Sequence, residues 1–518
     1  MPRERKRRVD SLEPEELAEE ADEYSRWLRA HGVVWSGRRL RTTTDGVVAG
    51  WGCVATAQIK RGEELVRIPR AACLGAEAAE ADADVQDNEK DSQRRMALVL
   101  GRASASDEWA PFVRKLTRAS CPWLWPEAEQ QRLFKGTELG PVLAMKRKAL
   151  AEEHAALPPD TAYSLEEYVE LCGLAASHLN PWFGGCIAPF NTTLNYSSEP
   201  NVGFEPKGAD FVVGVALRKI SAGEELTQEY ADATTDLIYK YGFAPRLAPT
   251  DCSPIGRGED GAQPETLEDD VVSISLEELV RCVHAACPSL ADSYAGMTSS
   301  SSSVGHSLAL GADRVTALVR AGAVEPCPWD GLGNQLTLEL SPDGGGTARL
   351  VGAAIVLCAP EDKWRAAAAE LETLTAAATQ VGSDAQSKRS TSEDARVGDD
   401  DLVAATLLGS LAGVSPEERK ALTELAASEG GEDGDPWPSL VTAILAGEKG
   451  EKRFPAAWVA AKEAIGRRRA QLEEGARGAG EPNDCKIEGA WKLASHLRQL
   501  ERSILTSADE AIVDGLLG

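Results

Sequence analysis

The segment from Ile187 to Phe243 constrains the fold of this 518-residue chain most strongly. Within it, the β-branched and apolar run from Asp210 to Leu217 predicts a strand with at least one buried face. The sequence Ser221-Ala222-Gly223-Glu224 then predicts a turn, and Glu225 to Tyr230 predicts a second extended segment before a short helix. This order of turn, strand, turn, strand and short helix indicates a β-rich region.

Aromatic residues close this segment. Tyr230 ends the second strand, and Tyr241 and Phe243 follow within one Tyr-Gly-Phe sequence. Side chains spaced in this way can converge on one small aromatic pocket, whereas a single aromatic residue is most often part of a core. Asn195 lies upstream in a turn-rich stretch. The four residues are therefore interpreted together.

Short strands are also expected near the amino terminus, after an amphipathic helix over residues 12 to 30. Residues 31 to 73 are rich in Val, Ile, Thr and Gly, with turn sequences between the apolar runs. They include Gly50-Trp51-Gly52. Glycines at both ends of this tripeptide let the backbone approach a ligand closely, because no Cβ stands in the way. A Gly-x-Gly turn alone remains weak evidence.

A helical block separates these two groups of strands. The pattern from about 90 to 180 is helical, and Ser164-Leu165-Glu166-Glu167 is a capping box that opens a helix running toward His178. After the strands, the Pro- and Gly-rich stretch 246 to 265 predicts a connection.

The remainder of the chain is mostly helical in pattern. Gln335 to Leu340 and Arg349 to Leu357 are the exception, because they predict a β-hairpin. Mobile loops are expected near 298–304 and 382–400. The predicted helices are 275–287, 306–322, 361–378, 401–413, 415–428, 453–475 and 486–514.

Composition excludes several classes of protein. The net charge of -27, from 82 acidic and 55 basic residues, argues against a nucleic-acid binder and suits a basic protein partner, although it also serves solubility alone. The sequence contains no apolar run of about eighteen residues, so no membrane span is predicted. The 11 Cys form no CxxC pair, so neither a metal site nor a disulfide framework is expected, and a reducing compartment fits best.

Taken together, these motifs resemble the SET domain of protein methyltransferases, in the branch typified by the Rubisco large-subunit and ribosomal-protein lysine methyltransferases. The resemblance implies an α+β fold: a SET-type β fold of short strands with a helical insert, followed by a mainly helical carboxy-terminal substrate-binding domain. The implied division is an amino-terminal helix in 1–40, the SET domain in 41–245 with its insert at about 90–180, a linker in 246–265 and the helical domain in 266–518.

The same resemblance implies S-adenosylmethionine as cofactor and assigns roles to individual residues. Tyr230 matches the catalytic tyrosine, which orients the amine near the methyl group. Tyr241 and Phe243 match aromatic residues of the lysine channel, and Asn195 matches the residue that holds the methionine part of the cofactor. The cofactor-binding residues implied are Gly50, Trp51, Gly52, His178, Asn195, Tyr196 and Tyr230, with no metal.

Three positions depart from the pattern of this branch. Thr192 stands where the family usually has Asp, and Tyr196 stands where it has His. His178 replaces an Arg that reaches the cofactor carboxylate, and an imidazole lacks the bidentate reach of a guanidinium. These departures bear on cofactor affinity more than on the geometry of methyl transfer.

The sequence therefore predicts an S-adenosylmethionine-dependent protein-lysine N-methyltransferase that acts on a non-histone protein. Two alternatives stay open: a weakly active or inactive SET-fold scaffold that binds a basic protein, and a protein-histidine methyltransferase. We expect a monomer that binds neither nucleic acid nor membranes. The expected compartment is the cytoplasm or the nucleus, and a chloroplast location stays open.

Overall fold

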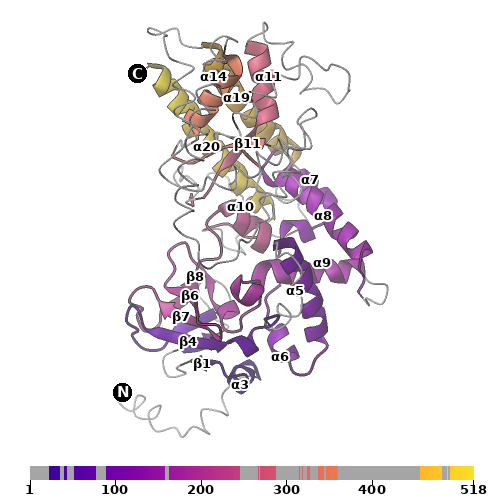
Figure 1. Cartoon of the computed structure of the whole chain (residues 1–518), viewed down its shortest axis with the longest axis vertical. Coiled ribbons are helices and arrows are strands. Elements are labelled where there is room, and N and C mark those ends of the chain that lie inside the picture. The colour runs from indigo at the N-terminus through magenta and orange to yellow at the C-terminus, as the bar shows by residue number, and fades with distance from the viewer. Residues whose placement is uncertain are drawn as a thin grey trace, which may run out of the picture. The chain divides into compact units, whose positions relative to one another are not determined.

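The chain forms two compact units in a computed structural model (Figure 1). The first comprises Met1–Trp125 and Leu150–Leu247, and the second comprises Pro126–Ala149 and Ala248–Gly518. The helical block expected at about 90–180 is thus divided between the units. The residues described are 23–35, 40–43, 52–76, 89–118, 120–157, 163–245, 266–267, 269–286, 314, 318, 324–326, 336–343, 346–359, 364, 455–480, 487 and 490–517.

The first unit contains an antiparallel sheet with the strand order β1-β4-β7-β6. These strands are β1 (Val34–Trp35), β4 (Glu64–Pro69), β7 (Phe211–Ala216) and β6 (Val202–Lys207). β7 confirms the strand predicted between Asp210 and Leu217. It is central in the sheet, and its pairing with β4 places Ile68 opposite Val212, both fully buried. This central position explains why β7 is almost continuously apolar.

A second sheet in the same unit has the order β2-β3-β8-β5. Its strands are β2 (Leu40–Thr43), β3 (Gly52–Ala55), β8 (Glu225–Gln228) and β5 (Asn195–Tyr196). β8 pairs antiparallel with β3, with Leu226 opposite Cys53, and parallel with β5, with Thr227 opposite Asn195. Three segments that are far apart in the sequence thus meet side by side on β8.

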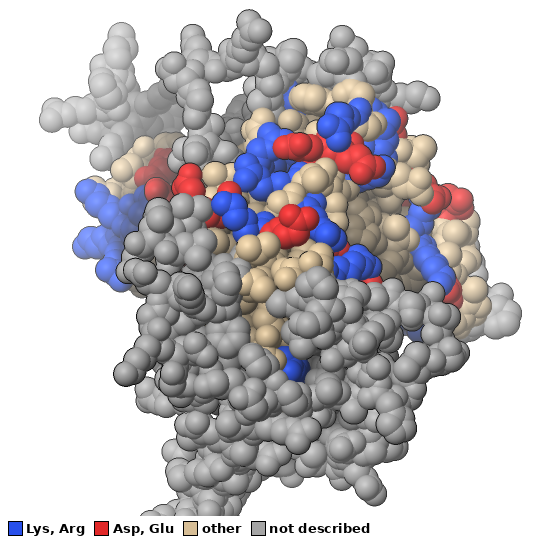
Figure 2. All heavy atoms as spheres, turned by 90° about the horizontal axis from the view of Figure 1, so that it is seen from above, with Lys and Arg blue, Asp and Glu red and all other residues tan. Residues whose placement is uncertain are grey.

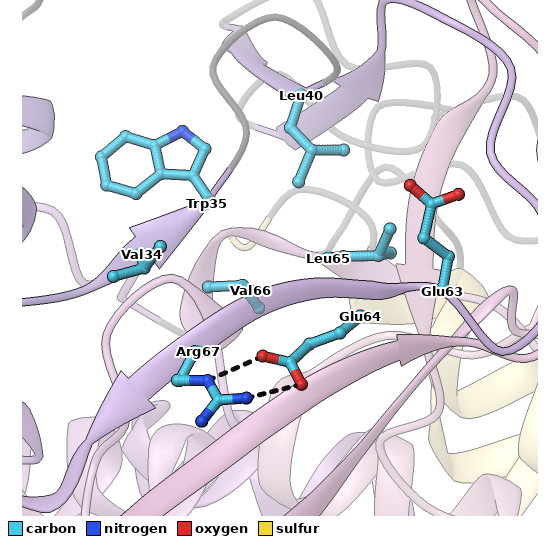
Figure 3. Close-up of a pocket in the computed structure, with 8 residues that line it drawn as sticks. All are labelled: Val34, Trp35, Leu40, Glu63, Glu64, Leu65, Val66 and Arg67. Carbon is cyan, nitrogen blue, oxygen red and sulfur yellow. Dashed lines mark hydrogen bonds and ion pairs between the residues drawn. The ribbon is translucent and has the colours of Figure 1, made fainter.

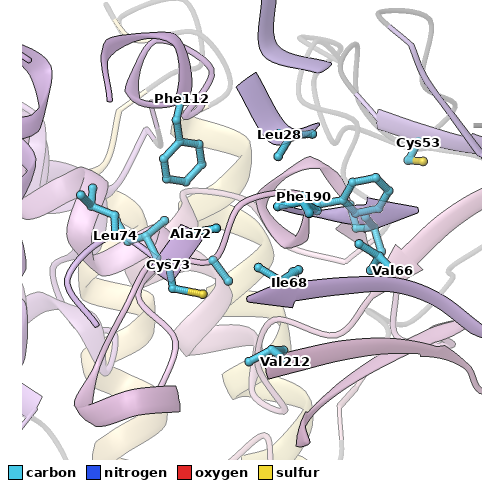
Figure 4. Packing of buried hydrophobic residues seen from close by; sticks show 14 of the residues in the cluster. Leu28, Cys53, Val66, Ile68, Ala72, Cys73, Leu74, Phe112, Phe190 and Val212 are labelled. Carbon is cyan, nitrogen blue, oxygen red and sulfur yellow. The ribbon is translucent and has the colours of Figure 1, made fainter. Parts of the chain in front are cut away.

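The core of the first unit lies between these strands and the flanking helices (Figure 4). Helix α3 (Glu23–Ala30) contributes Tyr24, Trp27 and Leu28, and the Tyr24 hydroxyl accepts a hydrogen bond of 3.0 Å from the Phe190 backbone nitrogen. Phe112 stacks on Trp27 with 5.1 Å between ring centroids. Burying each such side chain stabilises the fold by about 1.5–3 kcal/mol, so α3 is an integral part of this unit.

The capping box predicted at Ser164 is confirmed at the start of α9 (Leu165–His178). The Ser164 Oγ accepts from the Glu167 backbone nitrogen at 3.2 Å, and the Glu167 Oε2 accepts from the Ser164 backbone nitrogen at 2.8 Å. The other helical segments of this unit are η1 (Arg70–Ala72), α5 (Glu89–Ser104), α6 (Ala110–Val113), η2 (Pro122–Leu124), η3 (Trp182–Gly184), η4 (Asn191–Thr193), α10 (Thr234–Asp236) and η5 (Leu237–Tyr241).

The second unit is mainly helical in its described residues. Its helices are α7 (Glu127–Phe134), α8 (Leu139–Ala155, which runs across the division), α11 (Leu276–Ala286), α14 (Thr347–Cys358), α19 (Pro455–Gly478) and α20 (Ala490–Leu517). They confirm the helices predicted at 275–287, 453–475 and 486–514. A small antiparallel sheet accompanies them, with β10 (Glu325–Pro326), β11 (Leu336–Leu340) and β9 (Val272–Ser275) in this order.

The predicted hairpin in this unit is wrong. β11 forms as expected, but it pairs with β9 and β10, and residues 349 to 357 lie within α14. That run is apolar on nearly every side and is buried, and periodicity alone does not distinguish a buried helix from a buried strand. Predictions for 12–22, 361–363, 365–378, 401–428, 298–304 and 382–400, and for 306–322 apart from Arg314 and Leu318, lie outside the described residues. In the described part of the chain, no helix is both long and apolar enough to span a membrane.

A buried ionic cluster in the second unit links α19, α20 and the turn before α8. Arg468 of α19 donates to Glu138 at 3.0 Å and to Glu501 of α20 at 2.8 Å. Glu501 also accepts from the backbone nitrogen of Glu138 at 2.9 Å. Burial raises the pKa of the Glu501 carboxyl, Arg468 opposes this shift, and the neighbouring Glu138 reinforces it. Arg468 is thus the cation that compensates two buried carboxylates.

Candidate functional site

The centre of the candidate site lies on β8, where Gly52, Asn195 and Glu225 meet. The pairing of β8 with β3 and β5 brings them together. The Asn195 Nδ2 donates to the Glu225 Oε1 at 2.6 Å. Glu225 is only 6% exposed, so this hydrogen bond forms in an environment of low polarity, where it is strengthened. The contact holds the Asn195 amide against the Glu225 carboxylate.

Gly52 leaves space beside this pair. A Cβ at Gly52 would lie 2.6 Å from the Glu225 Oε1 and 3.0 Å from the Asn195 Nδ2, both closer than van der Waals contact permits. The glycine is therefore required for the close approach of β3 to the Asn195–Glu225 pair. Gly50 and Trp51, also predicted to bind cofactor, lie outside the described residues.

Tyr230 is fixed by its hydroxyl. The phenol donates a hydrogen bond of 2.6 Å to the backbone oxygen of Leu194, the residue before Asn195. Burial raises the pKa of Tyr230, and the nearby Tyr241 and Glu225 raise it further. The phenol therefore stays protonated near neutral pH. It acts as an oriented hydroxyl group and is unsuited to the role of a general base.

Four aromatic rings form one cluster, which we call the aromatic cluster: Tyr196, Tyr230, Tyr241 and Phe243. Ring centroids are 4.7 Å apart for Tyr230–Tyr241, 5.7 Å for Tyr196–Tyr230 and 5.3 Å for Tyr196–Phe243. The rings of Tyr241 and Phe243 are 6.1 Å apart. The structure thus brings together the aromatic residues that the sequence singled out. The Tyr196 ring is an addition, because the sequence analysis assigned Tyr196 to the cofactor and not to the aromatic pocket.

A close backbone contact positions the Tyr-Gly-Phe sequence. Gly242 has φ 77°, and a Cβ there would lie 2.1 Å from the backbone oxygen of Ser120. The preceding π-helical turn η5 is held by Trp123, whose Nε1 donates to the Tyr239 oxygen at 3.0 Å. The Cys121 thiol donates to the Lys240 oxygen at 2.9 Å. The residues of η2 and Cys121 before it thus hold the backbone that carries Tyr241 and Phe243.

Gly242→Ala is expected to destabilise the first unit by about 1–3 kcal/mol, because it combines a left-handed backbone with a backbone clash. Chemical denaturation followed by tryptophan fluorescence measures the change. Gly223→Ala is the matched control, since Gly223 has φ 90° but no atom within 4 Å of a Cβ. Equal losses in the two variants would show that the Ser120 contact contributes nothing.

His178 lies at the end of α9 and is engaged elsewhere. Its Nε2 lies 2.9 Å from the backbone oxygen of Thr117, which can only accept, so this nitrogen carries the proton. Burial lowers the pKa of His178, and the hydrogen bond to Thr117 partly offsets this. Among the contacts of the described residues, none joins His178 to Gly52, Asn195 or Tyr230. The structure therefore does not group this predicted cofactor ligand with the others.

Two further side chains of β8 shape the site, and the sequence did not single them out for it. Glu225 orients Asn195, and Gln228 binds the turn before β5. The Asn191 Nδ2 donates to the Gln228 Oε1 at 2.6 Å, and the Gln228 Nε2 donates to the backbone oxygen of Asn191 at 3.0 Å. Within the described residues, no cluster of His, Cys, Asp and Glu is able to hold a metal ion.

A family model of the SET domain matches residues 50–231, the part of the chain that contains β3, β5 and β8. Rubisco LSMT bound to AdoMet has the same fold, with a TM-score of 0.53, 14% identity and coverage of 98% of this chain and 93% of that one. The SET domain of LSMT bound to lysine and AdoHcy gives a TM-score of 0.51 at 13% identity, covering 97% and 92%.

Curated relatives of similar sequence are N-lysine methyltransferases. SETD6 of Mus musculus is 27% identical over 255 residues, covering 43% of this chain and 53% of the relative. SETD6 of Homo sapiens is 26% identical over 238 residues, covering 40% and 50%. The chain thus matches about half the length of these curated relatives.

Proposed function

We propose that this protein is an S-adenosylmethionine-dependent protein-lysine N-methyltransferase that acts on a non-histone protein. The observation that carries the proposal is the aromatic cluster placed directly beside Gly52, Asn195 and Glu225. The names of the SETD6 relatives support the activity. The LSMT structures with lysine, AdoHcy and AdoMet support the substrate and cofactor classes.

The residues around Gly52 fit the methionine part of the cofactor. Gly52 lets β3 approach the Asn195–Glu225 pair, because a Cβ there would lie 2.6 Å from the Glu225 Oε1. The Asn195 amide is held by Glu225, so its position beside the proposed methionine site is fixed. S-Adenosylmethionine, when bound, supplies a methyl group activated by a sulfonium. The role of Gly52, Asn195 and Glu225 is to hold that group in line with the acceptor amine.

The aromatic cluster prepares the acceptor. A free lysine has a pKa of about 10.4, but the reaction needs the neutral amine. The half-buried rings of Tyr230, Tyr241 and Phe243 remove water from the amine and thereby lower its pKa. The Tyr230 hydroxyl donates its proton to Leu194 and keeps lone pairs for the amine hydrogens. Aromatic faces also accommodate the methylated cation that forms.

Glu225 is expected to act as a positioning residue for Asn195. Glu225→Leu removes the acceptor of the Asn195 amide, and we expect roughly tenfold weaker binding of S-adenosylmethionine in calorimetric titration. Glu225→Gln is the matched control because its amide oxygen still accepts, and we expect it to bind within about threefold of the wild type. If the two variants bound the cofactor equally, the orientation of Asn195 would not depend on this contact.

Transfer of labelled methyl groups tests the proposed function. The protein is incubated with methyl-labelled S-adenosylmethionine and size-fractionated cellular proteins, and modified residues are identified by mass spectrometry. Label on lysine that depends on the enzyme supports the proposal. Label confined to histidine would instead make the protein a histidine methyltransferase. Absence of transfer, with cofactor bound, would favour the scaffold alternative.

We further propose that the substrate is basic and that the protein works in the cytoplasm or the nucleus. The net charge of -27 favours a basic partner. The described cysteines Cys53, Cys73, Cys121, Cys172, Cys186, Cys282 and Cys358 are all buried free thiols, which suits a reducing compartment. The test compares the binding of acidic and of basic peptide pools at low salt. Tighter binding of the basic pool would support a basic substrate.

A further inference from the structure

A cavity of about 150 Å³ lies between α19 and α20 in the second unit, and we call it the α19–α20 cavity. Ala476 of α19 and Ala479, which follows the helix, form one side. The other side is a single face of α20, where Trp491, Ser495, Arg498, Gln499 and Arg502 follow helical spacing. None of these described lining residues is acidic. The cavity therefore combines an apolar wall with a wall of hydrogen-bond donors.

Arg498 is the central group of this face. It is only 5% exposed. Its Nη2 donates to the backbone oxygens of Leu133 and Lys135, but its Nε has no hydrogen-bond partner among the described atoms. A buried donor without an acceptor destabilises a protein substantially. Arg498 therefore brings an unused donor and a positive charge to the wall of the cavity.

The charge of this arginine is incompletely compensated. Burial lowers the pKa of Arg498, Glu501 opposes this shift, and Arg502 lowers it further. Glu501 is also bound by Arg468 in the buried ionic cluster. On the surface seen in Figure 2, by contrast, basic and acidic side chains are interspersed over the described residues. Two arginines without an acidic lining residue are therefore a local exception in an acidic chain.

A cavity in the first unit differs from the α19–α20 cavity because acidic residues line it. It measures about 120 Å³ and is lined by residues of β1, β2 and β4 and by Glu63 (Figure 3). Its only cationic lining residue among those described, Arg67, is bound by Glu64 with contacts of 2.7 and 2.9 Å. That cavity provides no free positive charge, so it is not a candidate for anion binding.

We propose that the α19–α20 cavity binds a single oxyanion, a phosphate or a carboxylate group, between Arg498 and Arg502. Its volume of about 150 Å³ is roughly ten times the space that one water molecule needs in a cavity, so one phosphate or carboxylate group fits. Guanidinium groups bind both oxyanions through paired charged hydrogen bonds, and Ser495 and Gln499 add neutral donors. Trp491 is a fixed wall, because its Nε1 donates to the Gly480 oxygen at 3.2 Å. This inference does not depend on methyl transfer.

Calorimetric titration of the full chain with inorganic phosphate tests the proposal, with sodium acetate as the second arm and ionic strength held constant. We expect saturable binding of at least one anion. Arg502→Gln should weaken that binding about tenfold or more. Arg502 is exposed, so this variant is expected to fold, whereas Arg498 also supports two backbone oxygens. Ser495→Ala should weaken binding a few-fold.

Arg469→Gln is the matched control. It removes one positive charge from α19 outside the cavity, where Arg469 lies 3.5 Å from Asp509. Its anion affinity should equal that of the wild type. Binding of phosphate alone or of acetate alone would identify the chemistry of the occupant. Failure of both anions to saturate the wild type, or equal weakening by Arg502→Gln and Arg469→Gln, would overturn the proposal.

Discussion

Tyr230→Phe is expected to lower the rate of methyl transfer about 100-fold, the scale of loss for a misplaced reacting group. The variant keeps the ring in the aromatic cluster but loses the hydroxyl that contacts the Leu194 oxygen at 2.6 Å. Because that hydroxyl is proposed to orient the amine, the loss should fall on the rate of transfer. Affinity for S-adenosylmethionine should change by less than about threefold, since Gly52, Asn195 and Glu225 are untouched.

Tyr168→Phe is the matched control for this experiment. Its hydroxyl is also hydrogen-bonded, to the Glu153 Oε2 at 3.2 Å, but it belongs to α9 and not to the aromatic cluster. Both variants should lose about 1 kcal/mol of stability. Only Tyr230→Phe should lose activity in the labelled-methyl assay. Wild-type rates for Tyr230→Phe would remove the role assigned to this hydroxyl.

Arg468→Met is expected to destabilise the protein by about 3–5 kcal/mol, because it leaves the buried carboxylates of Glu138 and Glu501 without their cation. Methionine is apolar and of similar length, so lost packing contributes little. The change is measured as the free energy of unfolding in denaturant, followed with a probe in the second unit. Arg469→Gln breaks only a partly exposed ion pair and should cost at most about 1 kcal/mol.

The pH dependence provides a second test of this cluster. Burial raises the folded-state pKa of Glu501 above its unfolded value. The folded state therefore holds a proton that the unfolded state releases, and the contribution of Glu501 to stability falls as the pH rises between the two pKa values. Without Arg468 this fall should steepen, so acidification toward pH 5 should partly rescue Arg468→Met. A loss of stability in Arg468→Met that does not vary with pH would contradict this account of the buried cluster.

The sequence predicted much of the candidate site because its residues belong to short, local signals. The predicted strand between Asp210 and Leu217 and the predicted turn at Ser221 both form. The aromatic residues of the Tyr-Gly-Phe sequence converge with Tyr230, as predicted. Asn195 reaches Glu225 because β5 pairs in parallel with β8, a long-range contact that no local pattern reveals. The same pairing carries the Tyr196 ring into the aromatic cluster.

Glu225 shows why the remainder of the site was not predictable. Glu224 and Glu225 are consecutive and chemically identical in sequence. In the structure, Glu224 is held at the turn by Arg218 at 2.6 Å, while Glu225 points toward Gly52 and Asn195. Which carboxylate faces inward depends on the register of β8 against β3, and one shifted residue would exchange them. The wrong hairpin at residues 349 to 357 has a related cause, since burial on all sides removes the periodicity that identifies a helix.

Calorimetric titration of the purified protein with S-adenosylmethionine tests the central claim most directly. Thr192, His178 and Tyr196 depart from the family pattern, whereas Gly52, Asn195 and Glu225 lie in contact and are proposed to hold the cofactor. A micromolar dissociation constant, about 8 kcal/mol of binding free energy, is the expected result. Absence of binding at millimolar cofactor would contradict the methyltransferase assignment and leave a SET-fold scaffold.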